Sequence, residues 1–140
     1  MQLKRTLPLL TMALLLFCSF MPAPAAKHIK PLGICDFAFQ NNTVYNVADA
    51  IFYTSREKLV YSNVGPGNAT TGTTIEFDDA GDTFTYTITF GTRPNTSSVV
   101  HVHFGTDIIS EVIPAGVTSV TTTIPGPLPY SGIVVYLDPQ

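Results

Sequence analysis

The sequence has few residues that could crosslink the chain or carry a strong charge. Its 140 residues include two cysteines, three histidines and no tryptophan, and only 12% are Asp, Glu, Lys or Arg. Cys18 falls in an apolar N-terminal run, so Cys35 is the single cysteine of the region that follows and has no internal disulfide partner there. Cys35 alternates with Phe37 and Phe39, and we expect it to be buried. An intermolecular disulfide or a modified thiol is the alternative.

Motifs of the common enzyme classes are also missing. The chain has no G-x-S-x-G elbow, no P-loop, no H-E-x-x-H and no Cys and His arranged with an orienting group. Its formal net charge is -3 and it has no basic cluster, which excludes a typical nucleic-acid-binding surface. We therefore expect a protein that is not an enzyme, needs no cofactor and has no nucleic-acid partner.

The N-terminus has the order of a secretory signal peptide, in which basic, apolar and small residues follow one another. Lys4 and Arg5 precede an apolar run over 7–21, and small residues come next. The run is shorter than the roughly 20 residues of a membrane span, so a retained anchor is disfavoured. We expect cleavage after Ala25, with Ala26 as the alternative.

The predicted cleavage divides the chain into three parts. Residues 1–25 form the signal peptide, residues 26–33 a short flexible lead, and residues 34–140 a single domain of the size of one hydrophobic core. We expect the mature protein to be secreted or at the cell surface, or periplasmic if the source is a Gram-negative bacterium. It then keeps no stable membrane span.

Residues 34–140 have the pattern of an all-β domain. Runs of β-branched and aromatic residues are interrupted about every 8–12 residues by Gly, Pro, Asn or Asp, and no segment has helical periodicity. The expected fold is a single antiparallel β-sandwich of immunoglobulin-like architecture, although the Cys, Trp, Cys pattern of true immunoglobulin domains is missing. The expected strands cover 34–40, 44–54, 58–63, 71–77, 82–91, 97–104, 108–113, 117–124 and 132–137.

The segment TFTYTITF, residues 83–90, alternates strictly between threonine and apolar side chains. This pattern predicts a strand with one buried and one solvated face. The next expected strand, residues 97–104, also alternates between apolar and other side chains. If the two strands form a hairpin, their apolar faces match when His101 and His103 lie on the threonine side.

Three further strands differ from this simple alternation. The segment 44–54 has no clean apolar phase, which suggests either a bulge or a strand that is partly covered on both sides. The segment 132–137 is continuously apolar and fits a central strand. The segment 117–124 is polar and fits the edge of a sheet.

His101 and His103 are candidate metal ligands. Side chains at positions i and i+2 of a strand lie on one face, about 7 Å apart, so two imidazoles could converge on one zinc or copper ion. The expected neighbours are threonines, which are poor ligands for these ions, and no third ligand is evident. A solvent-facing pair is therefore the leading interpretation, and a metal site is the alternative.

A second candidate site lies in the acidic segment EFDDAGD. The carboxylates of Asp78, Asp79 and Asp82 could wrap a calcium ion, which takes several oxygen ligands. Their spacing is not that of an EF-hand, and Asp-rich turns also form without a metal, because Asp caps its own backbone. An ordinary turn is the leading interpretation.

The expected turns carry two other kinds of candidate residue. Asn41, Asn68 and Asn95 each begin an Asn-x-Ser/Thr pattern and would be glycosylation sites if the protein is eukaryotic. Tyr130 lies in the last expected loop and is the tyrosine left free to meet a ligand.

The leading functional hypothesis is a secreted, non-catalytic β-sandwich module. It would bind an unidentified protein or glycan, or serve a structural role, through a sheet face or the end loops. One alternative is a metal-binding protein that uses His101 and His103. Another is a surface subunit that assembles by pairing of an edge strand such as 117–124.

Overall fold

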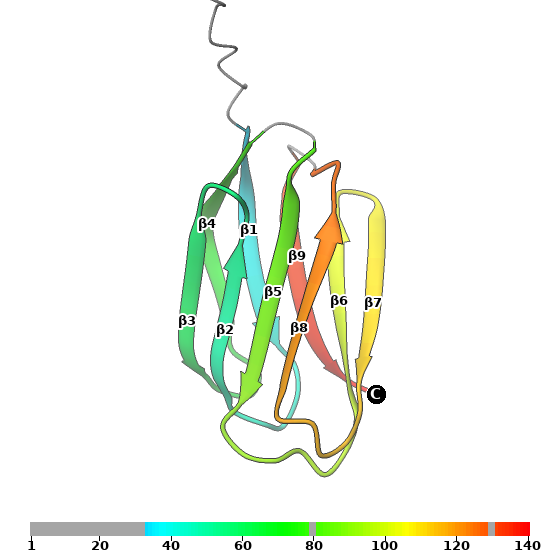
Figure 1. Cartoon of the computed structure of the whole chain (residues 1–140). Helices are drawn as coiled ribbons and strands as arrows, with labels where there is room; N and C mark the ends of the chain where they lie inside the picture. The colour runs from blue at the N-terminus through cyan, green and yellow to red at the C-terminus, as the bar shows by residue number, and fades with distance from the viewer. Residues whose placement is uncertain (1–32, 79–80, 129–130) are drawn as a thin grey trace, which may run out of the picture.

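A computed structural model describes residues 33–78, 81–128 and 131–140 of the chain. Within these ranges strands are the only regular secondary structure (Figure 1). The expected signal peptide and residues 26–32 of the expected lead lie outside the described residues. No helix in the described ranges is long and apolar enough to cross a membrane.

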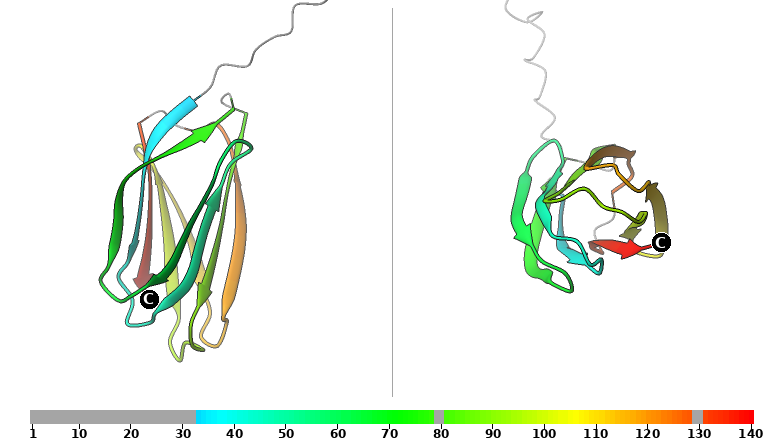
Figure 2. Two further views of the ribbon diagram at one scale, coloured as in Figure 1. Left: turned by 90° about the vertical axis from the view of Figure 1, so that its left-hand side faces the viewer. Right: turned by 90° about the horizontal axis from the view of Figure 1, so that it is seen from below.

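The strands form two sheets that pack face to face, as expected for a β-sandwich (Figures 1 and 2). Sheet A has five strands in the order β4-β1-β9-β6-β7, and sheet B has four in the order β3-β2-β5-β8. Every expected strand is present, with ends that differ by a few residues. The strands are β1 (Gly33–Asn41), β2 (Val47–Tyr53), β3 (Lys58–Val64), β4 (Ala69–Phe77), β5 (Thr83–Phe90), β6 (Ser98–Phe104), β7 (Asp107–Ile113), β8 (Ser119–Pro125) and β9 (Ile133–Pro139).

The first and last strands pair in parallel. β1 runs beside β9, with Phe37 opposite Ile133 and Asn41 opposite Leu137. The other strand pairs of the described residues are antiparallel. The expectation of a wholly antiparallel sandwich is therefore wrong for this pair. Side chains alternate between the faces of a sheet in either direction of pairing, so the sequence pattern carries no information about direction.

Two strands that are consecutive in the sequence belong to different sheets. β5 pairs with β2 and β8 in sheet B, whereas β6 pairs with β7 and β9 in sheet A. The expected hairpin between them is wrong, because residues 91–97 cross from one sheet to the other. The threonines of β5 lie on the outer face of sheet B, and His101 and His103 lie on the outer face of sheet A. Both arrangements bury the same apolar faces, so alternation could not distinguish them.

Three expectations about single strands are confirmed. The ladder between β2 and β5 has a register shift between Val47 and Asp49, which is the expected irregularity. β9 lies at the centre of sheet A, and β8 lies at an edge of sheet B.

The core lies between the sheets and is rich in aromatic rings. The ring centroids of Phe37 and Phe52 are 4.7 Å apart, and those of Phe52 and Phe84 are 6.1 Å apart. Burying each side chain of this size stabilises the fold by about 1.5–3 kcal/mol. Cys35 is 3% exposed and free, as expected. Burial, together with the charge of Asp36, raises the pKa of the Cys35 thiol to about 11 and keeps it neutral.

Candidate functional site

The outer face of sheet B uses most of its hydroxyl groups within the sheet. Three pairs of hydroxyls bridge β5 and β8 and form regular rungs across the ladder. The pairs are Thr85 with Thr123 at 2.9 Å, Thr87 with Thr121 at 2.9 Å, and Thr89 with Ser119 at 3.0 Å. These hydroxyls therefore stabilise the strand pair and are partly satisfied without a ligand.

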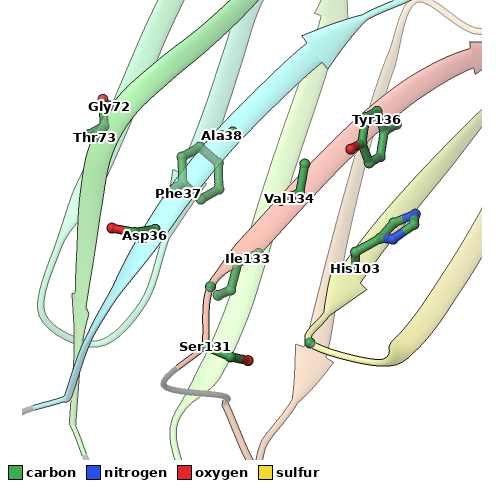
Figure 3. A pocket seen from close by; sticks show the side chains of 12 residues that line it. Asp36, Phe37, Ala38, Gly72, Thr73, His103, Ser131, Ile133, Val134 and Tyr136 are labelled. Carbon is green, nitrogen blue, oxygen red and sulfur yellow. The ribbon is translucent and has the colours of Figure 1, made fainter.

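The outer face of sheet A is hollowed near the end of β6 and the start of β9. A pocket of about 470 Å³ spans β4, β1, β9 and β6 (Figure 3). Ala38 and Val134 lie opposite each other in the β1–β9 pair, and their short side chains leave the middle of the pocket open. Larger side chains surround them, among them Asp36, Tyr136 and His103. The volume falls within the range of about 300–1,000 Å³ that is usual for small-ligand sites.

Two glycines set the edges of this pocket. Gly72 in β4 has φ of 76°, and a Cβ built on it would meet nothing within 4 Å. Gly132, just before β9, has φ of 120°, and a Cβ there would lie 3.3 Å from the carbonyl oxygen of Asp36. L side chains rarely adopt either conformation. The open edges of the pocket thus follow from backbone conformation.

An aromatic pair forms one side of the pocket. The rings of His103 and Tyr136 have centroids 5.0 Å apart and an interplanar angle of 69°, an edge-to-face contact. Sequence analysis missed Tyr136, because the apolar run 132–137 does not reveal which residues face outward. The register supplies that information, since Tyr136 lies opposite His101. Tyr130, the tyrosine singled out from the sequence, lies outside the described residues.

Several polar side chains of the pocket take no part in the polar contacts that hold the described residues together. In the described part of the chain, no hydrogen bond or ion pair joins the side chain of Asp36, Ser131 or Tyr136 to another residue. Asp36 is the one carboxylate among the described lining residues, and neither Lys nor Arg is among them. The pocket thus combines an aromatic wall and an apolar floor with free hydroxyl and carboxylate groups.

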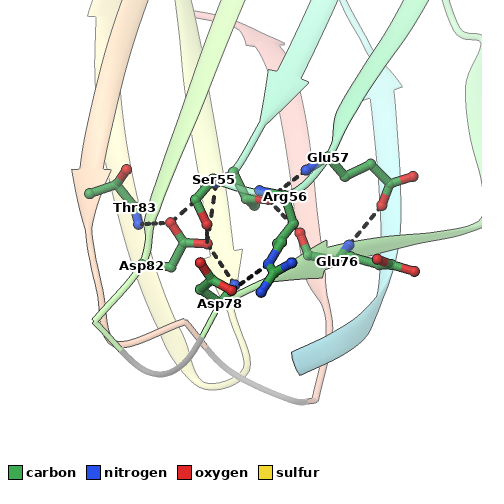
Figure 4. A network of polar contacts seen from close by, with 8 residues as sticks. Ser55, Arg56, Glu57, Glu76, Asp78, Asp82 and Thr83 are labelled. Atoms are coloured by element: carbon green, nitrogen blue, oxygen red, sulfur yellow. Dashed lines mark hydrogen bonds and ion pairs between the residues drawn. The ribbon is translucent and has the colours of Figure 1, made fainter. Parts of the chain in front are cut away.

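A second hollow, of about 530 Å³, lies on the outer face of sheet B beside the β2–β3 turn. Tyr53 lines it together with charged residues of the turn. Two of these charges are already engaged: Arg56 pairs with Asp78, and the Glu57 carboxylate accepts the backbone N–H of Glu76 at 2.7 Å (Figure 4). The polar groups of this hollow hold the turn in place, so the pocket on sheet A is the better candidate for a ligand site.

The acidic segment proposed for calcium takes part in the same network. The Asp82 carboxylate accepts the backbone N–H groups of Ser55, Asp78 and Thr83 and the Ser55 hydroxyl, at 2.7–3.3 Å (Figure 4). Burial opposes ionisation, but these hydrogen bonds outweigh it and lower the pKa of Asp82 below its usual range. Asp79 lies outside the described residues. Calcium binding stays a prediction, and the described oxygens of Asp82 already have protein donors.

The two histidines do share one face, as alternation predicts, but their neighbours are not threonines. Nδ1 of His101 lies 2.7 Å from Oγ of Ser110, and its Nε2 lies 3.8 Å from Oδ2 of Asp138. His103 packs on Tyr136. Among the described residues, no three His, Cys, Asp or Glu side chains are grouped so that they could hold a metal ion. Metal binding by His101 and His103 stays the untested alternative.

The three glycosylation patterns differ in accessibility. Asn41 is 0% exposed, and its Nδ2 donates to three backbone carbonyls at 2.9–3.2 Å. A glycan on this nitrogen is incompatible with the folded chain, so the acceptor expected there is wrong. Asn68 and Asn95 are exposed, and glycosylation at these two positions stays a prediction.

Comparison of the chain with protein families, with curated proteins and with solved structures gave no match. The function is therefore inferred from the residues of this chain.

Proposed function

We propose that the protein is a secreted or cell-surface, non-catalytic module that binds an extracellular partner through the pocket on the outer face of sheet A. The observation that carries the proposal is the pocket itself, which joins an aromatic wall to polar groups that the fold leaves unused. Export is supported by the signal-peptide pattern before residue 26. The sequence has no motif of a common enzyme class, and this supports a binding role for the domain.

The remaining outer surface of sheet A supports the same assignment. Ile34, Ile108 and Val112 lie on this face and are 49%, 57% and 49% exposed. The solvated face of a two-layer sandwich is usually polar. Exposed aliphatic side chains on the outer face of a sheet are typical of a surface that contacts a partner.

We further propose that the architecture is immunoglobulin-like in the broad sense. Two facing sheets of short strands enclose one core, and the connecting loops gather at the two ends of the sandwich (Figure 1). Proteins of this architecture commonly bind through a sheet face or the end loops.

A screen that makes no assumption about the ligand tests the binding proposal. The purified, ¹⁵N-labelled protein is mixed with a library of small polar and aromatic fragments, and amide shifts are mapped onto the structure. We expect hits to cluster at Ala38, Gly72 and His103. Ala38→Leu places a larger side chain in the pocket on sheet A and should abolish the fragment-induced shifts. Thr87→Leu, which places the same leucine side chain on the outer face of sheet B, is the control and should leave them unchanged. Fragment shifts centred elsewhere, or no shifts at all, would refute the proposal.

Assembly through an edge strand is a second candidate function, and β7 favours it. This strand forms one edge of sheet A and exposes Ile108, Ile109 and Val112 by 57%, 42% and 49%. A regular, apolar edge is a template for pairing with another strand. Sedimentation of the wild type and of Ile109→Lys over a wide concentration range tests this, because a charge at the edge blocks pairing. A wild type that stays monomeric at millimolar concentration excludes self-assembly.

A further inference from the structure

We infer that the pocket on sheet A is a subsite for an uncharged pyranose ring of a carbohydrate. This inference rests on the proposed binding function and names the ligand class. Three properties of the described lining residues point to this class: a partly exposed aromatic surface, unused hydrogen-bonding groups and the absence of cationic side chains.

The aromatic wall suits the apolar face of a sugar. A pyranose ring presents a face of C–H groups with slight positive charge, and the face of an aromatic ring carries slight negative charge. Tyr136 is partly exposed in the pocket, and its edge-to-face contact with His103 fixes its position. The short side chains of Ala38 and Val134 beside it leave room for a flat ring.

The polar groups suit the hydroxyls of the same ring. The carboxylate of Asp36 can accept two hydroxyl hydrogens, and the hydroxyl of Ser131 can donate or accept. In the described residues these side chains have no protein hydrogen bond, in contrast to the paired threonines of sheet B. A polyhydroxylated ligand would satisfy groups on both sides of the pocket at once.

The charge of the pocket excludes the anionic sugars. Asp36 is the one carboxylate among the described lining residues, and the described cations Arg56, Lys58 and Arg93 do not line the pocket. A uronate, a sulfated sugar or a phosphate would meet a like charge without a compensating cation, whereas a hydroxyl can donate to the carboxylate. The ligand expected from this balance is a neutral hexose unit.

Titration with defined sugars tests the inference. The purified, ¹⁵N-labelled protein is titrated with the methyl glycosides of glucose, mannose, galactose and N-acetylglucosamine, and with galacturonate. We expect at least one neutral glycoside to bind in the millimolar range and to shift the amides around Ala38 and Gly132. Galacturonate should bind at least about tenfold more weakly than methyl galactoside. No binding of any neutral glycoside, binding outside the pocket, or equal binding of galacturonate would overturn the inference.

Matched variants assign the roles of individual residues. Tyr136→Ala should weaken binding about tenfold or more, and Asp36→Asn should weaken it several-fold, because a carboxylate accepts stronger hydrogen bonds than an amide. Tyr53→Ala removes an exposed tyrosine from the outer face of the other sheet and should have no effect. Ala38→Leu keeps every polar and aromatic group of the pocket but fills its floor, so it should also prevent sugar binding. This variant tests the inference if Tyr136→Ala does not fold. Unchanged sugar affinity in folded Tyr136→Ala or Ala38→Leu would contradict the assignment.

The fragment screen separates failure of this inference from failure of the proposed function. If fragments cluster in the pocket but no neutral glycoside binds, the pocket is a binding site for a different ligand class and the sugar inference is wrong. If fragments do not cluster there, the proposed function fails as well.

Discussion

Asp82 is the side chain through which two loops at one end of the sandwich are tied together. Its carboxylate accepts hydrogen bonds from Ser55, at the β2–β3 turn, and from Asp78 and Thr83, which flank the β4–β5 connection. The carboxylate is largely buried and is therefore more than a surface charge. It satisfies backbone N–H groups that would otherwise be left without a partner.

We expect Asp82→Asn to destabilise the protein by about 1–3 kcal/mol at pH 7, because the amide cannot accept all of these hydrogen bonds. Since the pKa of Asp82 is lowered in the folded state, its contribution is present above the unfolded value of about 3.9 and is lost as the pH falls through the lower folded value. Urea unfolding of the wild type and the variant at pH 7 and at pH 3 measures both effects. The difference between them should shrink at pH 3.

Asp107→Asn is the matched control for this prediction, because Asp107 is exposed and begins a strand at the sheet edge. It should change the free energy of unfolding little at either pH. An equal loss of stability in both variants would mean that the hydrogen bonds of Asp82 are not the cause.

At the scale of the elements, Glu111 joins two edge strands that belong to different sheets. β7 is an edge of sheet A and β8 is an edge of sheet B (Figure 1). The carboxylate of Glu111 in β7 accepts the hydroxyl hydrogen of Tyr86 in β5 and that of Thr122 in β8. Glu111 thus closes the sandwich on this side with a polar contact.

We expect Glu111→Ala to lower the free energy of unfolding by about 1–3 kcal/mol, because the hydroxyl of the buried Tyr86 loses its acceptor. A double-mutant cycle with Tyr86→Phe should give a coupling of about 0.5–3 kcal/mol. Asp107→Ala in the same strand is the control and should show no coupling. A coupling of zero for Glu111 and Tyr86 would contradict this role.

The same contact predicts how stability changes in alkali. Burial, followed by the hydrogen bond to Glu111, raises the pKa of Tyr86 above its usual value. Its contribution to stability is therefore complete below about pH 10 and is lost as the pH rises above the unfolded value. Unfolding of the wild type should become easier above about pH 10, and Tyr86→Phe should lack this part of the decrease.

At the scale of the whole molecule, the first prediction concerns maturation. The protein isolated after export should begin at Ala26, or at Lys27 if cleavage follows Ala26, which intact-mass measurement can determine. Ala25→Arg removes the small residue before the cut and should cause the precursor to accumulate. An exported protein that retains Met1 would contradict the signal-peptide interpretation.

The second whole-molecule prediction concerns metal ions. We expect the melting temperature to stay within about 1 °C after treatment with EDTA and after addition of zinc or copper, since no third ligand joins His101 and His103 among the described residues. A site filled at a hundred times its dissociation constant adds about 2.7 kcal/mol, a shift of several degrees for a chain of this size. A rise with zinc that His101→Ala abolishes would establish a metal site.

The positions of the strands could be predicted from the sequence, and so could the buried faces of the strands that alternate clearly. In β5, Phe84, Tyr86 and Ile88 are buried where alternation placed them, and Cys35 is buried beside Phe37. Alternation is a local property with a period of two residues, and burial of one face of a strand follows from it whichever strand lies alongside. The free state of Cys35 also agrees with the expectation from the sequence, which places the second cysteine, Cys18, in the predicted signal peptide.

The partners of each strand, and with them the pocket, were decided only by the tertiary structure. Tyr136 lies beside His103 because β9 pairs with β6, and the pocket reaches Gly72 because β1 lies between β9 and β4. A segment of seven residues between β5 and β6 can turn back within one sheet or cross to the other, and both choices bury the same apolar side chains. The choice depends on contacts between residues far apart in the chain, and a pattern that repeats every two residues cannot encode them.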